Sequence, residues 1–128
     1  MSIQFHLPDL FALTPFNALR GFHESYTRED RSSTEWALSY GIIPHKHDIL
    51  YASEPELLAN ISYNSCSVTK ERLKIIGNYL ALLLVTDELT DDQDDEGAAT
   101  TREAFIKALN PNSEDNEIDT SITRMVSE

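Results

Sequence analysis

The stretch TKERLKIIGNYLALLLVTDELTDDQDDEG, residues 69–97, joins the most apolar segment of the chain to its most acidic one. No proline interrupts it, and we expect one long helix that starts at Ser67 or Thr69 and ends at about Asp91. Gly77 and Asn78 lower the helix propensity in the middle, which indicates a close packing contact there. This is the longest and most apolar helix that the sequence predicts.

Helix signals also dominate the segments on either side, whereas strand signals are weak. Residues Ser53 to Glu56 have the form of a capping box with an early proline, and they open the segment ELLANISY. Residues Thr100 to Glu103 repeat the form and open AFIKAL, which stops at Asn110. A further helix is expected from about His23 to Tyr40. The sequence therefore predicts an all-α fold.

The chain divides into three regions by composition. Residues 1–22 predict an extended N-terminal arm, and residues 23–110 form the helical region that carries the acidic run. Residues 111–128 predict a polar C-terminal tail, with a short helix around Ile118 to Val126.

Length and charge limit the classes of function. With 128 residues the chain is about one domain. Ten basic residues against 22 acidic ones give a net charge of −12, so nucleic acid is not an expected partner. Cys66 is the single cysteine, which excludes an internal disulfide and predicts an inert buried thiol. No signal peptide and no apolar run long enough for a membrane span are recognisable, so we expect a cytoplasmic location.

The acidic run continues an apolar stripe of the long helix. At 100° per residue, one face collects Leu73, Ile76, Leu80, Leu83 and Leu84. A further step of three or four residues reaches Asp87, and Asp91 follows four residues later. Acids at the C-terminal end of a helix oppose its dipole, and like charges at this spacing repel. No base lies between Lys74 and Arg102 in the sequence, whereas a divalent cation would remove both penalties. Hard oxygen ligands favour Mg²⁺ or Ca²⁺.

Two other interpretations of the run remain open. Acidic runs after helices are commonly solvated loops, and Asp92, Asp95 and Glu96 fit that description. Alternatively, the residues from Asp92 to Gly97, with Glu103 at the twelfth position, have the spacing of an EF-hand calcium loop. The fifth position of that loop is Glu rather than Asp or Asn, and no second loop accompanies it.

Several segments together resemble a known family. The motif DELTD after an apolar helix is similar to the first metal motif of class I terpene cyclases, in the version of fungal sesquiterpene synthases. FHLPDLFALTPF resembles the N-terminal arm of those enzymes, ESYTREDRSSTEWALSYGI their first helix, and ELLANISY the helix before the metal-bearing one. Residues 5 to 110 follow the pattern in order and spacing.

The resemblance implies a partial class I terpenoid-synthase fold of four to five helices after the arm. It assigns Asp87 as the leading Mg²⁺ ligand, Glu88 as a neighbouring carboxylate beside the metal, and Asp91 as a further acid facing the same cavity. In the family, Mg²⁺ ions hold the diphosphate of farnesyl diphosphate and promote its departure. An apolar cavity then shields the cation and shapes its cyclisation.

The chain also departs from the family pattern. The second metal motif, Asn/Asp-x-x-x-Ser/Thr-x-x-x-Glu, is echoed by Asn116 and Thr120, but Arg124 follows where Glu is needed, and arginine cannot bind Mg²⁺. We therefore expect a form truncated relative to the family and inactive alone. The core face from Leu80 to Val85 would stay partly exposed and could support self-association. A non-enzymatic acidic helical module that binds a partner remains the alternative from another class.

Overall fold

The computed structural model describes residues 21–110 and 121–127. These residues contain six helices and no strand, which confirms the all-α prediction. The helices are α2 (Ser32–Leu38), α3 (His47–Ser53), α4 (Pro55–Ser62), α5 (Lys70–Asp91), α6 (Asp95–Leu109) and α7 (Ser121–Ser127). The predicted N-terminal arm lies outside the described residues, apart from Gly21 and Phe22.

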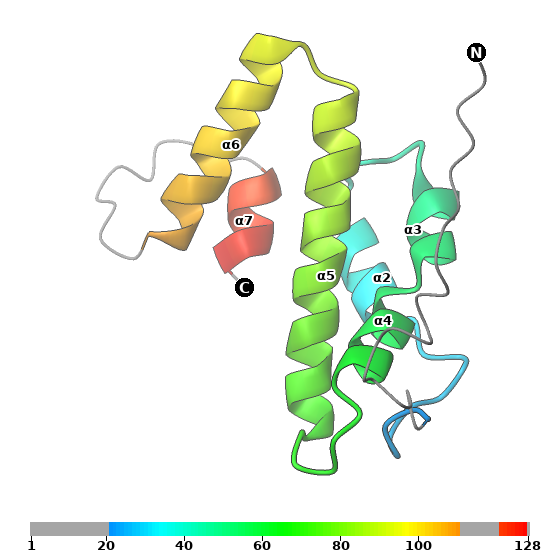
Figure 1. Ribbon diagram of the computed structural model, residues 1–128. Coiled ribbons are helices and arrows are strands. Elements are labelled where there is room, and N and C mark those ends of the chain that lie inside the picture. The colour runs from blue at the N-terminus through cyan, green and yellow to red at the C-terminus, as the bar shows by residue number, and fades with distance from the viewer. Residues whose placement is uncertain (1–20, 111–120, 128) are drawn as a thin grey trace, which may run out of the picture.

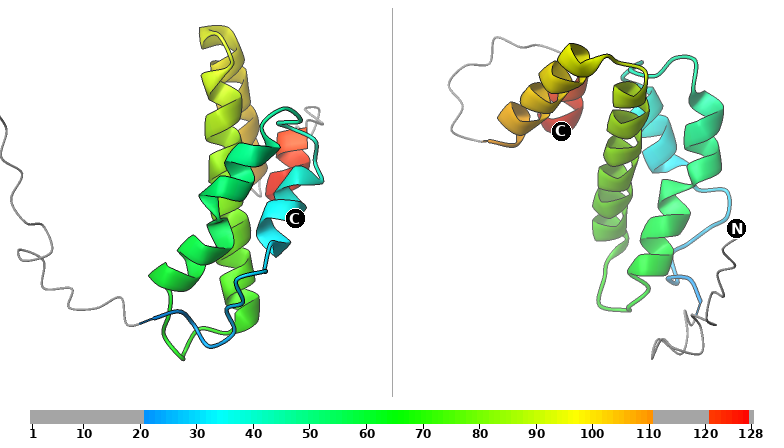
Figure 2. Two further views of the ribbon diagram at one scale, coloured as in Figure 1. Left: turned by 90° about the vertical axis from the view of Figure 1, so that its right-hand side faces the viewer. Right: turned by 45° about the horizontal axis from the view of Figure 1, so that its top comes forward.

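The long helix α5 forms the axis of the structure (Figure 1). The helices α2, α3 and α4 lie on one side of it, and α6 and α7 lie on the other. A short turn joins the end of α5 to the start of α6. Helix α6 then reverses direction, diverges from α5 and packs mainly against α7 (Figure 2). The C-terminal end of α5 is therefore the place where both sides of the fold meet.

The hydrophobic core lies around the second half of α5. Its buried members are Ala37, Ile43, Leu50, Ala81, Leu82, Val85, Ile122 and Met125. Ile122 and Met125 come from α7, within the segment predicted as a polar tail, and both side chains are almost fully buried. The core thus connects α7 to helices that lie far earlier in the chain.

The close contact predicted at the middle of the long helix is confirmed. A β-carbon placed on Gly77 would lie 2.5 Å from Ser33 Oγ, so α2 approaches α5 at a distance that glycine alone permits without a shift. The start of this helix is also as predicted, because Thr69 is the N-cap and its side-chain oxygen accepts the Arg72 N–H.

The buried face of α5 differs from the predicted stripe. The buried residues are Leu73, Gly77, Ala81, Leu82 and Val85. The predicted stripe is only partly covered, and Leu83 is 41% exposed. The reason is that α2 and α4 pack where α5 carries small residues, with Ser33 and Ala59 nearest to Gly77. The expected exposure of the apolar segment of α5 is thus found at Leu83.

Several predicted helix boundaries were wrong. The helix expected over 23–40 is confined to α2, and turns precede it. Ser53 ends α3 and donates its hydroxyl to Ile49 O, while Glu54 adopts a left-handed conformation, so no capping box opens α4. The helix expected to begin at Thr100 begins at Asp95 instead. Helix α3 was not predicted.

Two further observations concern exposure. Cys66 is exposed, so the expectation of a buried thiol was wrong. The tertiary structure places it in a turn before α5, away from the core. Among the described helices, none combines the length and the apolarity needed to cross a bilayer.

Candidate metal site at the end of α5

Asp87 lies in the last two turns of α5 and borders a hollow between α5 and α6. The hollow has a volume of about 440 Å³ and is lined by Leu83, Leu84, Thr86, Asp87, Thr90 and Phe105. Phe105 comes from α6, and the other residues come from α5. An apolar wall with one carboxylate at its rim is therefore present where the long helix ends.

The two threonines of the hollow hydrogen-bond to the backbone of their own helix. Thr86 Oγ1 donates to Leu82 O at 2.8 Å, and Thr90 Oγ1 lies 3.0 Å from both Thr86 O and Asp87 O. Their hydroxyl protons are thus used within α5. Among the residues that line the hollow, Asp87 is the charged one.

Asp91 follows Asp87 by one helical turn, and both residues are exposed. Over residues 21–110 and 121–127, no ion pair or side-chain hydrogen bond holds either carboxylate. These two predicted site residues are brought together on one stripe of α5 and are open to a ligand from solvent.

Glu88, the third predicted site residue, is engaged by a lysine from the other side of the fold. Lys46 Nζ lies 3.0 Å from Glu88 Oε2 and 2.9 Å from Glu88 O. The same ammonium lies 2.9 Å from Asp92 Oδ2. The Glu88 carboxylate is therefore engaged in an ion pair, unlike the carboxylates of Asp87 and Asp91.

Although no base lies near the acidic end of α5 in the sequence, Lys46 contacts these acids in the structure and offsets part of their negative charge. The hydrogen bond that Lys46 donates to Asp92, followed by the one that it donates to Glu88, raises the pKa of Lys46 above its usual value of 10.5. A cation at the last carbonyls of a helix is favourable for the helix dipole as well. Sequence reasoning missed this residue because 42 positions separate it from Glu88, and no local signal connects them.

The EF-hand interpretation is contradicted by the structure. Asp94 is the N-cap of α6, and its Oδ1 accepts the Gly97 N–H at 2.9 Å. Residues from Asp95 onward are helical, so the segment 92–103 cannot wrap around an ion as a calcium loop does. Glu103 is exposed on the helix rather than turned back to the start of the run.

The donors present fit one mode of metal binding. In the described part of the chain, no three His, Cys, Asp or Glu side chains converge to hold a metal ion by themselves. Asp87 and Asp91 offer carboxylates from adjacent turns, and Mg²⁺ is commonly held by one or two carboxylates together with waters and substrate phosphates. The residues thus fit a shared site and do not form a complete protein cage.

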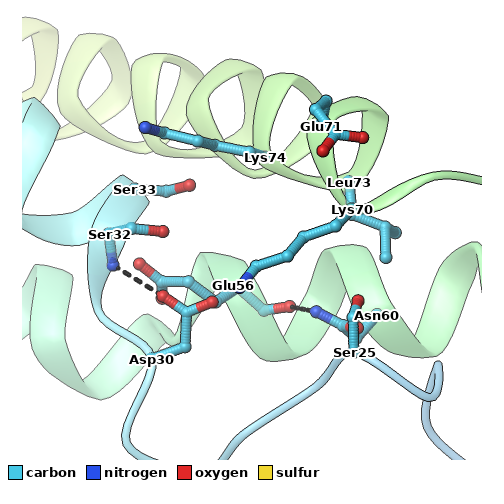
Figure 3. Close-up of a pocket in the computed structure, with 10 residues that line it drawn as sticks. All are labelled: Ser25, Asp30, Ser32, Ser33, Glu56, Asn60, Lys70, Glu71, Leu73 and Lys74. Carbon is cyan, nitrogen blue, oxygen red and sulfur yellow. Dashed lines mark hydrogen bonds between the residues drawn. The ribbon is translucent and has the colours of Figure 1, made fainter.

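A second cavity lies at the opposite end of α5, and most of the residues that line it have polar or charged side chains (Figure 3). It has a volume of about 180 Å³ and lies between α2, α4 and the first turns of α5. Glu56 is 4% exposed there, and its carboxylate accepts the Thr34 N–H at 2.6 Å and the Thr34 hydroxyl at 3.1 Å. Asn60 donates to Glu56 O. The contacts of Glu56 join α4 to the first turn of α2.

Comparisons with known proteins find distant relatives over most of this chain. It is 31% identical over 107 residues to a bifunctional terpene synthase from Cyclocybe aegerita, a match that covers 83% of this chain and 30% of that protein. The relationship to terpene synthases is distant. A linoleate 10R-lipoxygenase from Coprinopsis cinerea is 31% identical over 108 residues, again over 83% of this chain and 30% of that protein.

The chain thus spans about a third of the length of these two relatives. No protein-family model matches the sequence, and no solved structure matches it. Together with the helical fold, the comparisons support a distant terpene synthase relationship for the helical region that carries the acidic run.

Proposed function

We propose that the chain provides the first metal motif of a terpene synthase-like site, in which Asp87 and Asp91 bind Mg²⁺. The substrate we propose is a prenyl diphosphate, namely farnesyl diphosphate, with a sesquiterpene as product. The observation that carries the proposal is the hollow where the Asp87 carboxylate adjoins an apolar wall of Leu83, Leu84 and Phe105. The similarity to a terpene synthase supports the same assignment.

The arrangement suits a substrate with a charged end and an apolar end. Mg²⁺, when bound, would neutralise the diphosphate and the negative charge that develops on it as it leaves. Asp87 and Asp91 would hold the cation at the end of α5, and the side chains of Leu83, Leu84 and Phe105 would keep water from the hydrocarbon chain.

The charge of the chain makes a cation necessary for this role. With a net charge of −12, the protein repels a free diphosphate. The nearest base to the acidic run, Lys46, already contacts three oxygen acceptors. A divalent cation therefore provides the positive charge that the diphosphate requires.

The experiment is a Mg²⁺ titration in the presence of inorganic pyrophosphate. Asp87→Ala should abolish the binding, because the variant removes the carboxylate at the rim of the hollow. The matched control is Glu103→Ala, which removes another exposed carboxylate, on α6, and should leave binding unchanged. Binding that survives Asp87→Ala and is lost in Glu103→Ala would refute the assignment of the site.

The 128-residue chain by itself should not turn over farnesyl diphosphate. Residues 1–128 contain no Asn/Asp-x-x-x-Ser/Thr-x-x-x-Glu motif, because Arg124 stands where its glutamate is needed. Incubation with the substrate and Mg²⁺ should give no cyclised product above the control without enzyme, and a product would contradict this statement.

We also propose self-association through the exposed side of α5. Ile75, Tyr79 and Leu83 lie one turn apart on this helix and are 67%, 53% and 41% exposed. A second copy of the chain would cover them. The interpretation as a non-enzymatic acidic module, in contrast, receives no support from the comparisons.

A further inference from the structure

We propose that Lys46 is a positioning residue that decides which acids at the end of α5 receive the divalent cation. It would do so by binding Glu88 and Asp92, so that Asp87 and Asp91 alone remain available. This inference rests on the proposed function, because it concerns the same metal site.

The need for such a choice follows from helix geometry. Asp87 and Asp91 are four residues apart, and so are Glu88 and Asp92. Asp92 is the C-cap of α5 and keeps a right-handed helical conformation, so each pair lies on one stripe at the end of the helix. The two stripes are rotated by one residue, about 100°, around the helix axis. On spacing alone, both pairs could bind a divalent cation through carboxylates from adjacent turns. Only the stripe of Asp87 and Asp91 leads to the apolar hollow.

Lys46 occupies the other stripe completely. A lysine ammonium has three protons to donate, and three acceptors surround it: Glu88 O at 2.9 Å, Glu88 Oε2 at 3.0 Å and Asp92 Oδ2 at 2.9 Å. A divalent cation at this place would have to displace the ammonium or share its carboxylates with it. The pair formed by Glu88 and Asp92 is therefore withheld from metal binding.

The backbone around Lys46 is fixed, so its side chain starts from a defined position. The Lys46 N–H donates to Ile43 O at 3.1 Å, and Lys46 O accepts from Ile49 N and Leu50 N at the start of α3. Ile43 and Leu50 are buried in the core that also contains Val85 of α5. The packing of the segment between α2 and α3 thus aims the lysine at the last turn of α5.

The end of α5 contributes to the same contact. The Asp92 N–H donates to Leu89 O at 3.3 Å. Glu88 O accepts the lysine ammonium one residue earlier in the chain. Lys46 therefore contacts both a side chain and a carbonyl of the last turn, which holds Glu88 in one orientation.

The test measures free Mn²⁺ by electron paramagnetic resonance while Mn²⁺ is added to the chain with inorganic pyrophosphate. In the wild-type background, Asp87→Asn should weaken the affinity by about tenfold or more, because one ligand charge is removed. In a Lys46→Met background, the released Glu88 and Asp92 carboxylates should accept the ion, and the same Asp87→Asn change should weaken the affinity by less than about threefold. Lys46→Arg should behave as the wild type, because it keeps the cation at this place.

The outcomes separate the role of Lys46 from the proposed function. If Asp87→Asn has the same effect in both backgrounds, Lys46 does not select the ligand pair and the inference is wrong, while the metal site stands. If Asp87→Asn has no effect in the wild-type background, the metal site and the inference are both overturned. A purely structural lysine would lower the melting temperature of Lys46→Met without changing the dependence on Asp87.

A second variant keeps the test decisive if Lys46→Met does not fold. In the double variant Glu88→Gln/Asp92→Asn, the lysine is retained and the withheld pair loses its charge. The proposal expects an affinity for Mn²⁺ with pyrophosphate within about twofold of the wild type, because these acids are not ligands. A loss of fivefold or more would show that Glu88 or Asp92 binds the ion, and it would overturn the inference.

Discussion

Replacing Glu56 by alanine should destabilise the protein through the first turn of α2. The N-cap of this helix, Arg31, makes no side-chain capping bond, and the N–H of Thr34 is satisfied by Glu56 of α4 instead. Thr34 is fully buried, with 0% exposure, so water cannot replace the carboxylate without a rearrangement. The substitution leaves two donors without their partner and a void where a side chain was.

The size of the effect follows from these contacts. A buried donor left without a partner costs about 1–3 kcal/mol, and the lost packing adds about 1 kcal/mol. The variant also no longer has to bury a charged carboxylate, and this change by itself raises the free energy of unfolding. We therefore expect Glu56→Ala to lower the free energy of unfolding by about 2 kcal/mol, a large part of the ~5–15 kcal/mol typical of a domain.

Urea unfolding followed by circular dichroism measures this change. With a slope of about 1–3 kcal/mol per molar urea, the midpoint should fall by about 1 M. Glu56→Gln should lose less, about 1 kcal/mol, because its amide oxygen still accepts the Thr34 N–H. Glu103→Ala is the control on an exposed helix position and should stay within about 0.5 kcal/mol. A Glu56→Ala variant as stable as this control would refute the capping role.

Three further predictions concern other contacts of α5. Gly77→Ala should lower the free energy of unfolding by about 1 kcal/mol in thermal unfolding, because overpacking against Ser33 exceeds the gain in helix propensity. In a Ser33→Ala background the same change should be stabilising, and equal effects in the two backgrounds would contradict the contact. Because the pKa of Lys46 is raised in the folded protein, its ion pairs stabilise the protein fully below pH 10.5, the usual lysine value, and this stability is lost as the pH rises through the higher folded pKa. The melting temperature of Lys46→Met should therefore decline less steeply above pH 10.5 than that of the wild type, and an equally steep decline would contradict the stabilising role of these ion pairs. Sedimentation analysis should find concentration-dependent association that Ile75→Ser weakens and that Phe22→Ser, at another exposed site, leaves unchanged; equal effects of the two variants would argue against the α5 surface.

The parts of the fold that the sequence predicts are those with local causes. The long helix was predicted with its start at Ser67 or Thr69, and Thr69 is its N-cap, because the cap and the uninterrupted composition act within neighbouring turns. The end of α6 near Asn110 was predicted for the same reason, since the proline that follows cannot continue a helix.

Some of the mispredicted features depend on residues distant in sequence, whereas the start of α6 has a local cause, the cap at Asp94. In the first turn of α2, Asp30 accepts the Ser32 N–H locally, but the Thr34 N–H is accepted by Glu56 of α4, a contact that no local signal predicts. The buried face of α5 is set by the close approach of Ser33 to Gly77, a contact between helices that periodicity cannot reveal. The apolar stripe that precedes Asp87 on α5 was predicted from the sequence, but the residue of another helix that lines the same hollow, Phe105 of α6, was not.

The same distinction applies to the candidate site. The phase of the helix groups Asp87 with Asp91, and that grouping needs only the sequence. The ion pairs of Glu88 and Asp92 need Lys46, which the tertiary structure brings from the segment before α3. The calcium-loop interpretation failed because Asp94 caps a helix that begins one residue later.

The most direct test of the central claim locates the bound cation in solution. Mn²⁺ in substoichiometric amounts, added with pyrophosphate to the ¹⁵N-labelled chain, broadens the amide signals nearest to the ion. The account predicts broadening centred on residues 84–91, lost in Asp87→Asn and retained in Asp92→Asn. Broadening centred on residues 94–103, or broadening that persists in Asp87→Asn, would contradict a metal site at Asp87 and Asp91.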